Sequence, residues 1–151
     1  NSSPIKIHSQ DFTEVSIQSQ EDPEEGGANT LDVSTHLVRC KDKESEWILQ
    51  LSITVGAKAE EKRTSYLAHI DIRGHYQVHP SYSGDPERLV RITGASILYG
   101  AAREMICNIT SRCNNGMLTL PSVSFFEKKE VKARKKTVKK TTKKTSSRAS
   151  R

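Results

Sequence analysis

The sequence predicts an α+β fold in which a four-stranded antiparallel sheet is covered on one face by one long C-terminal helix. Four segments between residues 5 and 78 alternate apolar and polar side chains, which is typical of half-buried strands. Residues 94–116 instead repeat apolar side chains at three- and four-residue steps, the period of an amphipathic helix. The connections between strands are short, so we expect sequential pairing in a meander and a domain of two layers.

The four strands differ in how clearly they are marked. Residues 5–17 contain only short extended pieces, whereas residues 31–37, 47–55 and 66–78 alternate cleanly. An acidic loop with a proline and two glycines, residues 20–27, follows the first segment. A single helix covers only part of such a sheet, and apolar area left over usually marks a partner surface or a subunit interface.

The helical region is expected to begin at Asp85, a capping residue followed by Pro86. We expect one short turn, a break near Gly94, and then a long helix that ends at residues 114–116. An extended apolar segment, residues 117–126, follows. The apolar stripe expected on the long helix consists of Leu98, Ala101, Ala102, Met105 and Ile109.

Charge divides the chain into two parts. Residues 127–151 hold 12 of the 24 Lys and Arg residues and two of the 18 Asp and Glu residues, a net charge of +10. The remaining 12 basic and 16 acidic residues give residues 1–126 a net charge of −4. We therefore predict a folded domain over 1–126 and a disordered Lys/Thr-rich tail over 127–151.

No catalytic or metal-binding constellation emerges from the sequence. His69, Asp71 and His75 share one face of the fourth strand, but Arg73 places a cation among them, so a solvated polar face is the expected interpretation. The sequence has no GxSxG, GxGxxG or Walker-type loop. We expect a non-enzyme without cofactor or metal.

Cysteines and hydropathy bear on the compartment. Cys40, Cys107 and Cys113 form no CxxC pair and are expected to be buried or half-buried thiols. No run of eighteen apolar residues occurs, and the first residues lack the apolar core of a signal peptide. We expect a cytoplasmic protein with no membrane insertion.

The end of the helical region carries a family resemblance. An ordered set of short motifs resembles the helix-and-tail signature of the SecB protein-export chaperones and their SecB-like relatives. These motifs are Ile97-Leu98-Tyr99, Ala102-Arg103-Glu104, Thr110-Ser111-Arg112 and Leu118-Thr119-Leu120-Pro121-Ser122-Val123-Ser124-Phe125. Residues 10–17 are similar to the first strand of the family, and residues 66–78 to the fourth.

The resemblance implies a chaperone that holds unfolded polypeptides without ATP. Family members look like a four-stranded sheet followed by a long helix, assembled as a dimer of dimers (a homotetramer). Clients would be preproteins bound for export, with a translocase motor as partner, or an unstable antitoxin. The helix and the zinc-binding docking region that end the export chaperones have no counterpart in residues 127–151, which puts docking to the SecA motor in doubt.

A groove between sheet and helix would cover apolar segments of a client by burying area at about 25 cal/mol per Å². The expected lining residues are Trp47, Tyr76, Leu98, Tyr99, Met105, Phe125 and Phe126. The competing interpretation is that most of them belong to the core or to a subunit interface. For Leu98 and Met105 that competing interpretation is favoured.

The basic tail supports a second hypothesis, a nucleic-acid-associated protein. Lysines could hold phosphates by counterion release, but the tail has no aromatic residue, so binding would not depend on base sequence. The lysines expected to make such contacts are Lys135, Lys136, Lys139, Lys140, Lys143 and Lys144. A solubilising terminus without a partner is an equally open interpretation.

Overall fold

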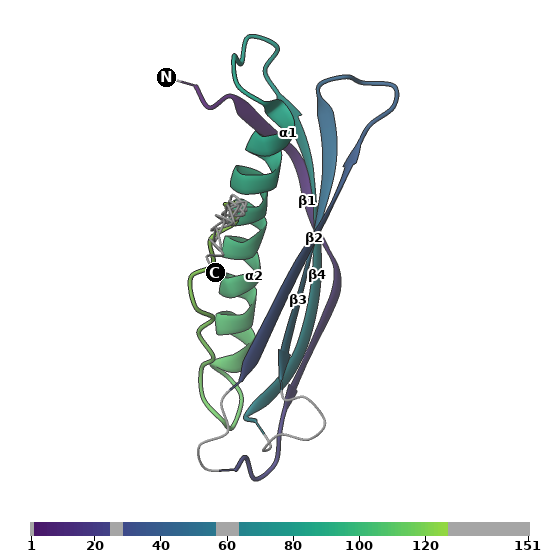
Figure 1. Ribbon diagram of the computed structural model, residues 1–151. Coiled ribbons are helices and arrows are strands. Elements are labelled where there is room, and N and C mark those ends of the chain that lie inside the picture. The colour runs from purple at the N-terminus through teal and green to yellow at the C-terminus, as the bar shows by residue number, and fades with distance from the viewer. Residues whose placement is uncertain (1, 25–28, 57–63, 127–151) are drawn as a thin grey trace, which may run out of the picture.

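The computed structural model describes residues 2–24, 29–56 and 64–126, and it contains one sheet with a helix packed on one of its faces (Figure 1). The predicted α+β fold of four antiparallel strands and one long C-terminal helix is confirmed. The tail, residues 127–151, lies outside the described residues, so its predicted disorder stays a prediction.

The sheet has the strand order β1-β4-β3-β2, and every neighbouring pair is antiparallel. The strands are β1 (Ile5–Ser19), β2 (Thr30–Arg39), β3 (Glu46–Gly56) and β4 (Tyr66–Val78). The meander is correct for β2 to β4, but β1 pairs with β4 rather than with β2. Alternation within a segment identifies a strand but does not identify its neighbour, and β1 is long enough to pair along all of β4.

Two β-bulges explain why β1 looks fragmented in the sequence. The register with β4 shifts between Ile7 and Ser9 and again between Phe12 and Glu14, so one extra residue is inserted at each place. Each extra residue moves the side chains that follow it to the other face of the sheet. The bulges therefore keep every apolar side chain of β1 on the face that carries α2. These side chains are Ile5, Ile7, Phe12, Val15 and Ile17, opposite Val78, Tyr76, Ile72, Ile70 and Ala68.

The core lies between the two central strands and the helix. Alternate residues of β3 and β4, such as Leu51, Ile70 and Ile72, are fully buried, whereas those between them face the uncovered side of the sheet. In β4 this uncovered face presents His69, Asp71, Arg73 and His75, the polar set expected from the alternation.

The helical region is continuous, and the expected break near Gly94 is wrong. It runs through α1 (Pro86–Leu89), the π-helical turn η1 (Val90–Gly94) and α2 (Ala95–Thr110). Gly94 has helical dihedral angles, and a Cβ there would lie 3.2 Å from the ring of Tyr76 and 3.3 Å from a methyl group of Leu49. The Tyr76 hydroxyl also donates to the Gly94 carbonyl at 3.1 Å. The glycine therefore permits close contact between helix and sheet.

The buried stripe of α2 differs from the expected one in its second half. Leu98 and Ala102 are buried as expected, but Ile106 is buried where Met105 and Ile109 are only half-buried. The physical reason is that residues 117–126 lie along α2 on the side away from the strands (Figure 1), so the helix carries apolar side chains on more than one side.

The helix ends at Thr110, four residues before the expected position. Turns and then the extended segment 117–126 follow it. Thr110 is the last residue of α2, and its hydroxyl donates to the Ile106 carbonyl and accepts from the Leu118 amide at 2.8 Å. Turns follow as far as Gly116, whose φ of 77° lies in the left-handed region. The segment 117–126 is then held by Leu120, which is buried, and by a hydrogen bond of 2.6 Å from the Tyr99 hydroxyl to the Pro121 carbonyl.

The predicted start of the helical region is confirmed and gives a first testable prediction. The Asp85 carboxylate accepts hydrogen bonds from the amides of Glu87 and Arg88 at 3.0 and 3.3 Å. Asp85→Ala should lower the free energy of unfolding by about 1 kcal/mol, whereas Asp85→Asn should retain most of the stability. Urea denaturation measures both, and equal losses in the two variants would contradict the capping role.

Candidate functional site

Four of the seven residues expected to line a client groove belong to the core. Trp47, Tyr76, Leu98 and Tyr99 are all buried. Burial also raises the pKa of the Tyr76 phenol above its ordinary value. This placement favours the core interpretation of these four residues, and a role for them in client contact stays a prediction.

The remaining three expected groove residues are accessible to different degrees. Met105 is half-buried on α2, and Phe125 is half-buried with its ring edge-on to Tyr99 at a centroid distance of 5.9 Å. Phe126 is exposed. The structure thus brings Tyr99 and Phe125 together.

Trp47 borders a cavity, although its own side chain is buried. It lines a cavity of 380 Å³ together with Arg39, Val78, Tyr82 and Pro86. The Arg39 guanidinium lies 5.7 Å from the centre of the Trp47 ring, a cation–π contact. This cavity lies at the end of the sheet where β2 finishes, β3 begins and the helical region starts.

The accessible apolar surface that sequence analysis missed lies on β1. We call it the β1 apolar row: Ile7, Phe12, Val15 and Ile17. Ile7 and Val15 are 42% and 41% exposed, and the other two are half-buried against the core. All four face the side of the sheet that carries α2, because their partners across the ladder are core residues of β4. The sequence signal was present in residues 5–17, but the two bulges broke its alternation.

The position of β1 adds backbone groups to this apolar row. β1 is an edge strand, and within the described residues it pairs only with β4. Its outer edge therefore offers backbone donors and acceptors to an added strand. Apolar side chains beside such an edge are the elements of β-strand addition, in which an extended peptide pairs with the sheet.

The opposite edge of the sheet is similar but less exposed. Leu31, Val33 and Leu37 of β2 are half-buried on the same side as α2. The helix therefore covers the central strands and leaves apolar side chains partly open at both edges.

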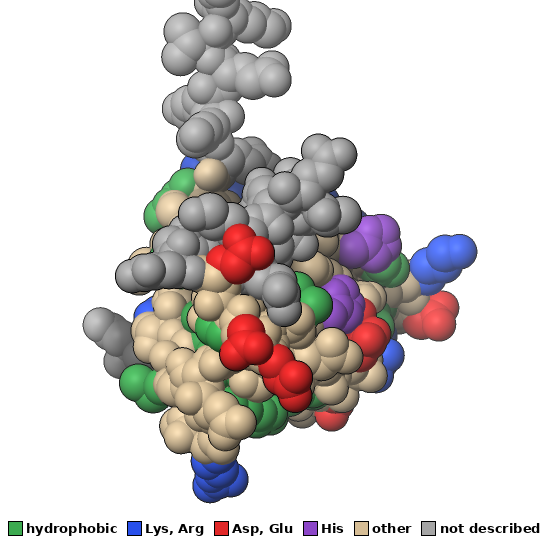
Figure 2. All heavy atoms as spheres, turned by 90° about the horizontal axis from the view of Figure 1, so that it is seen from below, with side chains coloured by type: hydrophobic (Ala, Val, Ile, Leu, Met, Phe, Trp, Pro, Cys, Tyr) green, Lys and Arg blue, Asp and Glu red, His purple; other side chains and the backbone are tan. Residues whose placement is uncertain are grey.

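Acidic side chains gather at the end of the molecule seen in Figure 2, with histidines beside them. This distribution fits the net negative charge of residues 1–126. The lysines proposed for nucleic-acid contact, Lys135 to Lys144, lie outside the described residues.

His69, Asp71 and His75 all lie on the uncovered face of the sheet, but they belong to two separate groups. His69 is 3.2 Å from Asp71, and both lie near Glu14 of β1. The Asp71 carboxylate accepts a 2.5 Å hydrogen bond from the Ser52 hydroxyl, which with His69 outweighs partial desolvation and holds the pKa of Asp71 below its ordinary value. His75 instead belongs to a second group.

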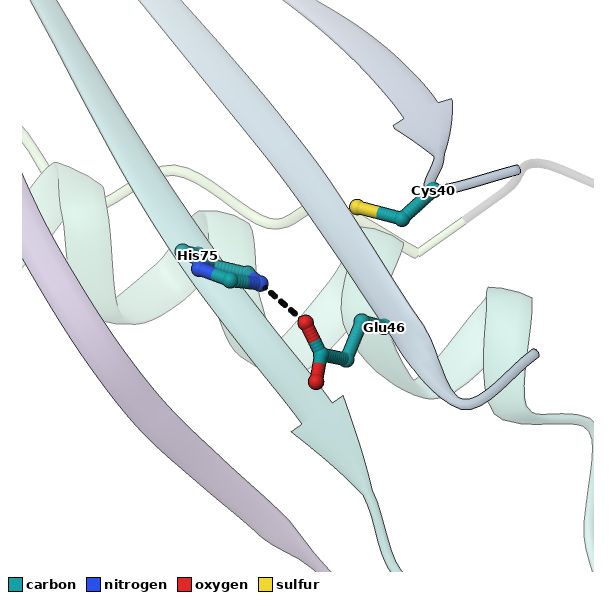
Figure 3. A group of neighbouring side chains, drawn as sticks. All are labelled: Cys40, Glu46 and His75. Carbon is teal, nitrogen blue, oxygen red and sulfur yellow. Dashed lines mark hydrogen bonds and ion pairs between the residues drawn. The ribbon is translucent and has the colours of Figure 1, made fainter. Parts of the chain in front are cut away.

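That second group consists of Cys40, Glu46 and His75 (Figure 3). His75 Nε2 lies 2.7 Å from Glu46 Oε2, and the side chain of Glu46 is only 10% exposed. Desolvation raises the pKa of Glu46, but the hydrogen bonds from His75 and Lys43 outweigh it and hold that pKa below its ordinary value. No local sequence pattern identifies this group, because its members come from three different strand ends.

No helix in the described ranges has both the length and the apolar character needed to cross a membrane.

Comparisons with known proteins find similar solved structures but no match by sequence. No protein-family model matches the sequence, and no curated protein matches it. Among solved structures, the SecB-like chaperone of Mycobacterium tuberculosis, in complex with a ChAD peptide from an antitoxin, matches with a TM-score of 0.59. The two chains are 17% identical, and the match covers 80% of this chain and 91% of the other. A protein of unknown function from Streptococcus agalactiae matches over 78% of this chain and 97% of its own length, at 11% identity and a TM-score of 0.48.

The match to the mycobacterial structure agrees with the resemblance noted in the helix and the following segment. The chain has a SecB-like fold, with the four-stranded antiparallel sheet and C-terminal helix that this resemblance implies.

Proposed function

We propose that this protein is a SecB-like, ATP-independent chaperone that holds unfolded or extended polypeptide segments. The observation that carries the proposal is the β1 apolar row on an edge strand of a SecB-like fold. The mycobacterial structure supports the class of ligand, since that SecB-like chaperone is in complex with a peptide from an antitoxin.

Binding of this kind needs no chemical step. An extended client segment would pair with the outer edge of β1 through its backbone and bury alternate apolar side chains against Ile7 and Val15. Each Å² of apolar area removed from water contributes roughly 25 cal/mol, distributed over several weak contacts. Backbone pairing and burial of apolar side chains depend little on which residues the client carries. Clients of many sequences can therefore bind, as a holding chaperone requires.

The wider role follows the resemblance and stays part of the proposal. Clients are preproteins for export or an antitoxin, and a translocase motor would be a partner in the first case. We also propose self-association as a dimer of dimers, a cytoplasmic location, a domain spanning 1–126, and no enzymatic activity.

The basic tail favours a second candidate function, nucleic-acid binding, and one experiment separates the two. The full chain should suppress aggregation of an unfolded model protein without nucleotide. A variant in which Lys135, Lys136, Lys139, Lys140, Lys143 and Lys144 are all changed to Gln keeps the length of the tail and removes six charges. We expect protection to be unchanged in this variant.

The nucleic-acid alternative makes the opposite prediction in the same variant. If six lysines contact phosphates, affinity for duplex DNA should fall about 10³-fold between 50 and 200 mM salt in the parent. The six-Gln variant should then lose this binding. An absence of protection by the parent, together with such salt-dependent binding, would replace the chaperone proposal with the second function.

A further inference from the structure

Three potential metal ligands meet on the uncovered face of the sheet. Cys40 follows the last residue of β2, Glu46 is the first residue of β3, and His75 lies near the end of β4. One ligand atom from each lies within 4.8 Å of the other two (Figure 3). They lie on the face opposite Trp47 and the core, so this group is separate from the β1 apolar row.

The backbone fixes the positions of Cys40 and Glu46. The Cys40 amide donates to the Glu46 carbonyl at 3.0 Å, and the Glu46 amide donates to the Lys43 carbonyl at 3.2 Å. These bonds close the β2–β3 hairpin and place Cys40 directly opposite Glu46. Both side chains therefore project to the same face, where His75 of the neighbouring strand already contacts Glu46. The residue after β2, the first residue of β3 and a residue near the end of β4 thus bring their side chains to one place on this face.

The spacing suits a small tetrahedral ion. Nitrogen and oxygen ligands about 2.0–2.1 Å from zinc in a tetrahedron lie roughly 3.4 Å from each other, and a thiolate lies slightly farther away. His75 Nε2 and Glu46 Oε2 are now 2.7 Å apart because they share a hydrogen bond. If a metal replaces the shared proton, the distance between these two atoms must increase by less than about 1 Å. Rotation of the two side chains can supply such a change.

The donor atoms indicate which ion would bind. A sulfur, an imidazole nitrogen and a carboxylate oxygen form a mixed set that zinc accepts, whereas calcium and magnesium take oxygen ligands. The other acidic group, Glu14 with His69 and Asp71, lacks a thiol, and its Asp71 is already bonded to Ser52. The Cys40 group is therefore the more selective of the two for zinc.

A bulge brings a further imidazole to the same place. His8 is the extra residue at the first β-bulge of β1, and its ring lies 5.0 Å from that of His75. His8 Nε2 is now hydrogen-bonded to the Gln77 side chain at 3.0 Å. Bulges commonly re-aim one side chain, and this one directs His8 beside the ligand group on the uncovered face.

One nearby cation must be accommodated. Lys43 Nζ lies 3.4 Å from Glu46 Oε1, but its side chain is 65% exposed. It contacts the other carboxylate oxygen from the one that faces His75. Because most of the lysine side chain is in solvent, its ammonium group can remain on Oε1 or turn into solvent while Oε2 binds the metal.

We propose that Cys40, Glu46 and His75 form a zinc-binding site that ties the β2–β3 hairpin to β4. Cys40 loses its thiol proton on binding and His75 coordinates as the neutral imidazole, so protons are released to solvent. The fourth position is left to water or to His8. The site does not depend on the proposed chaperone function.

Zinc titration of the reduced full chain tests the site. The parent should bind one zinc ion per chain and gain thermal stability from it. Cys40→Ser and His75→Gln should each weaken binding by on the order of 100-fold or more, since even changes outside the ligand set cost 10–100-fold. The matched controls are Cys107→Ser, a half-buried thiol on α2, and His69→Gln, from the other acidic group; both should bind zinc like the parent.

Cobalt provides a readout that identifies the ligand directly. Cobalt bound by a thiolate gives a sulfur-to-metal charge-transfer band in the near ultraviolet. That band should be present in the parent and in Cys107→Ser, and absent in Cys40→Ser. The proposal is overturned if the parent shows no such band, if the band survives in Cys40→Ser, or if zinc binding is lost in His69→Gln and retained in His75→Gln.

Discussion

Leu98→Ala is expected to lower the free energy of unfolding by about 3–5 kcal/mol. Leu98 is fully buried between α2 and the sheet, within the single core cluster of the described residues. Removing its branched end leaves a cavity that close-packed neighbours on two layers cannot fill. The measurement is the urea midpoint, with the slope of the transition unchanged.

Two methionines provide matched controls for this change. Met105→Ala lies on the same helix and changes helix propensity by about the same small amount, but Met105 is only half-buried. Its loss should be less than half that of Leu98→Ala. Met117, which is 63% exposed, should tolerate alanine within about 0.5 kcal/mol. Equal losses at positions 98 and 105 would contradict the observed orientation of α2.

The sequence predicts the strands and helix well because these depend on local alternation. The alternation of β4 gives its observed bounds, Tyr66–Val78, and the capping pair Asp85-Pro86 gives the start of the helical region. The place of β1 beside β4 depends on pairing between segments about sixty residues apart, which no local pattern encodes. The continuous helix through Gly94 depends on contact with Tyr76 and Leu49 of the sheet.

The candidate surfaces were harder to predict for the same reason. Aromatic side chains such as Trp47 and Tyr76 suit either a binding groove or a core, and only the packing of two layers shows that these two are buried. The exposed positions in β1 follow from two bulges that shift the phase of its side chains. Cys40 and His75 are 35 positions apart in sequence and meet only because β3 lies between β2 and β4.

Changing Ile7 and Val15 together to lysine is expected to reduce the affinity for an unfolded client by at least about tenfold. Burying one side chain of this size contributes about 1.5–3 kcal/mol, and a client that covers the β1 apolar row loses part of that contribution at two positions. Two lysines also place charges where the client side chains must leave water. The measurements are aggregation suppression and binding of an extended, labelled peptide by the full chain.

The sheet offers a matched control for this double change. Val38 is 48% exposed on β2, but its partner across the ladder, Ile48, lies on the uncovered face, away from α2. Val38→Lys therefore introduces one lysine at a similar exposure on the other side of the sheet, the same change as Ile7→Lys or Val15→Lys made singly, and should leave client affinity unchanged. Equal losses in Val38→Lys and in either single variant, Ile7→Lys or Val15→Lys, would show that charge alone weakens binding and would contradict the assignment to the β1 apolar row.

Solution mass decides whether this row contacts clients or another subunit. An edge strand with exposed apolar side chains can pair with a second copy as readily as with an extended client, because both offer the same backbone groups. If the double variant loses client affinity at unchanged mass, the row binds clients directly. If the mass falls instead, the row is a subunit contact, and the client surface must then be sought among the accessible residues Met105, Phe125 and Phe126.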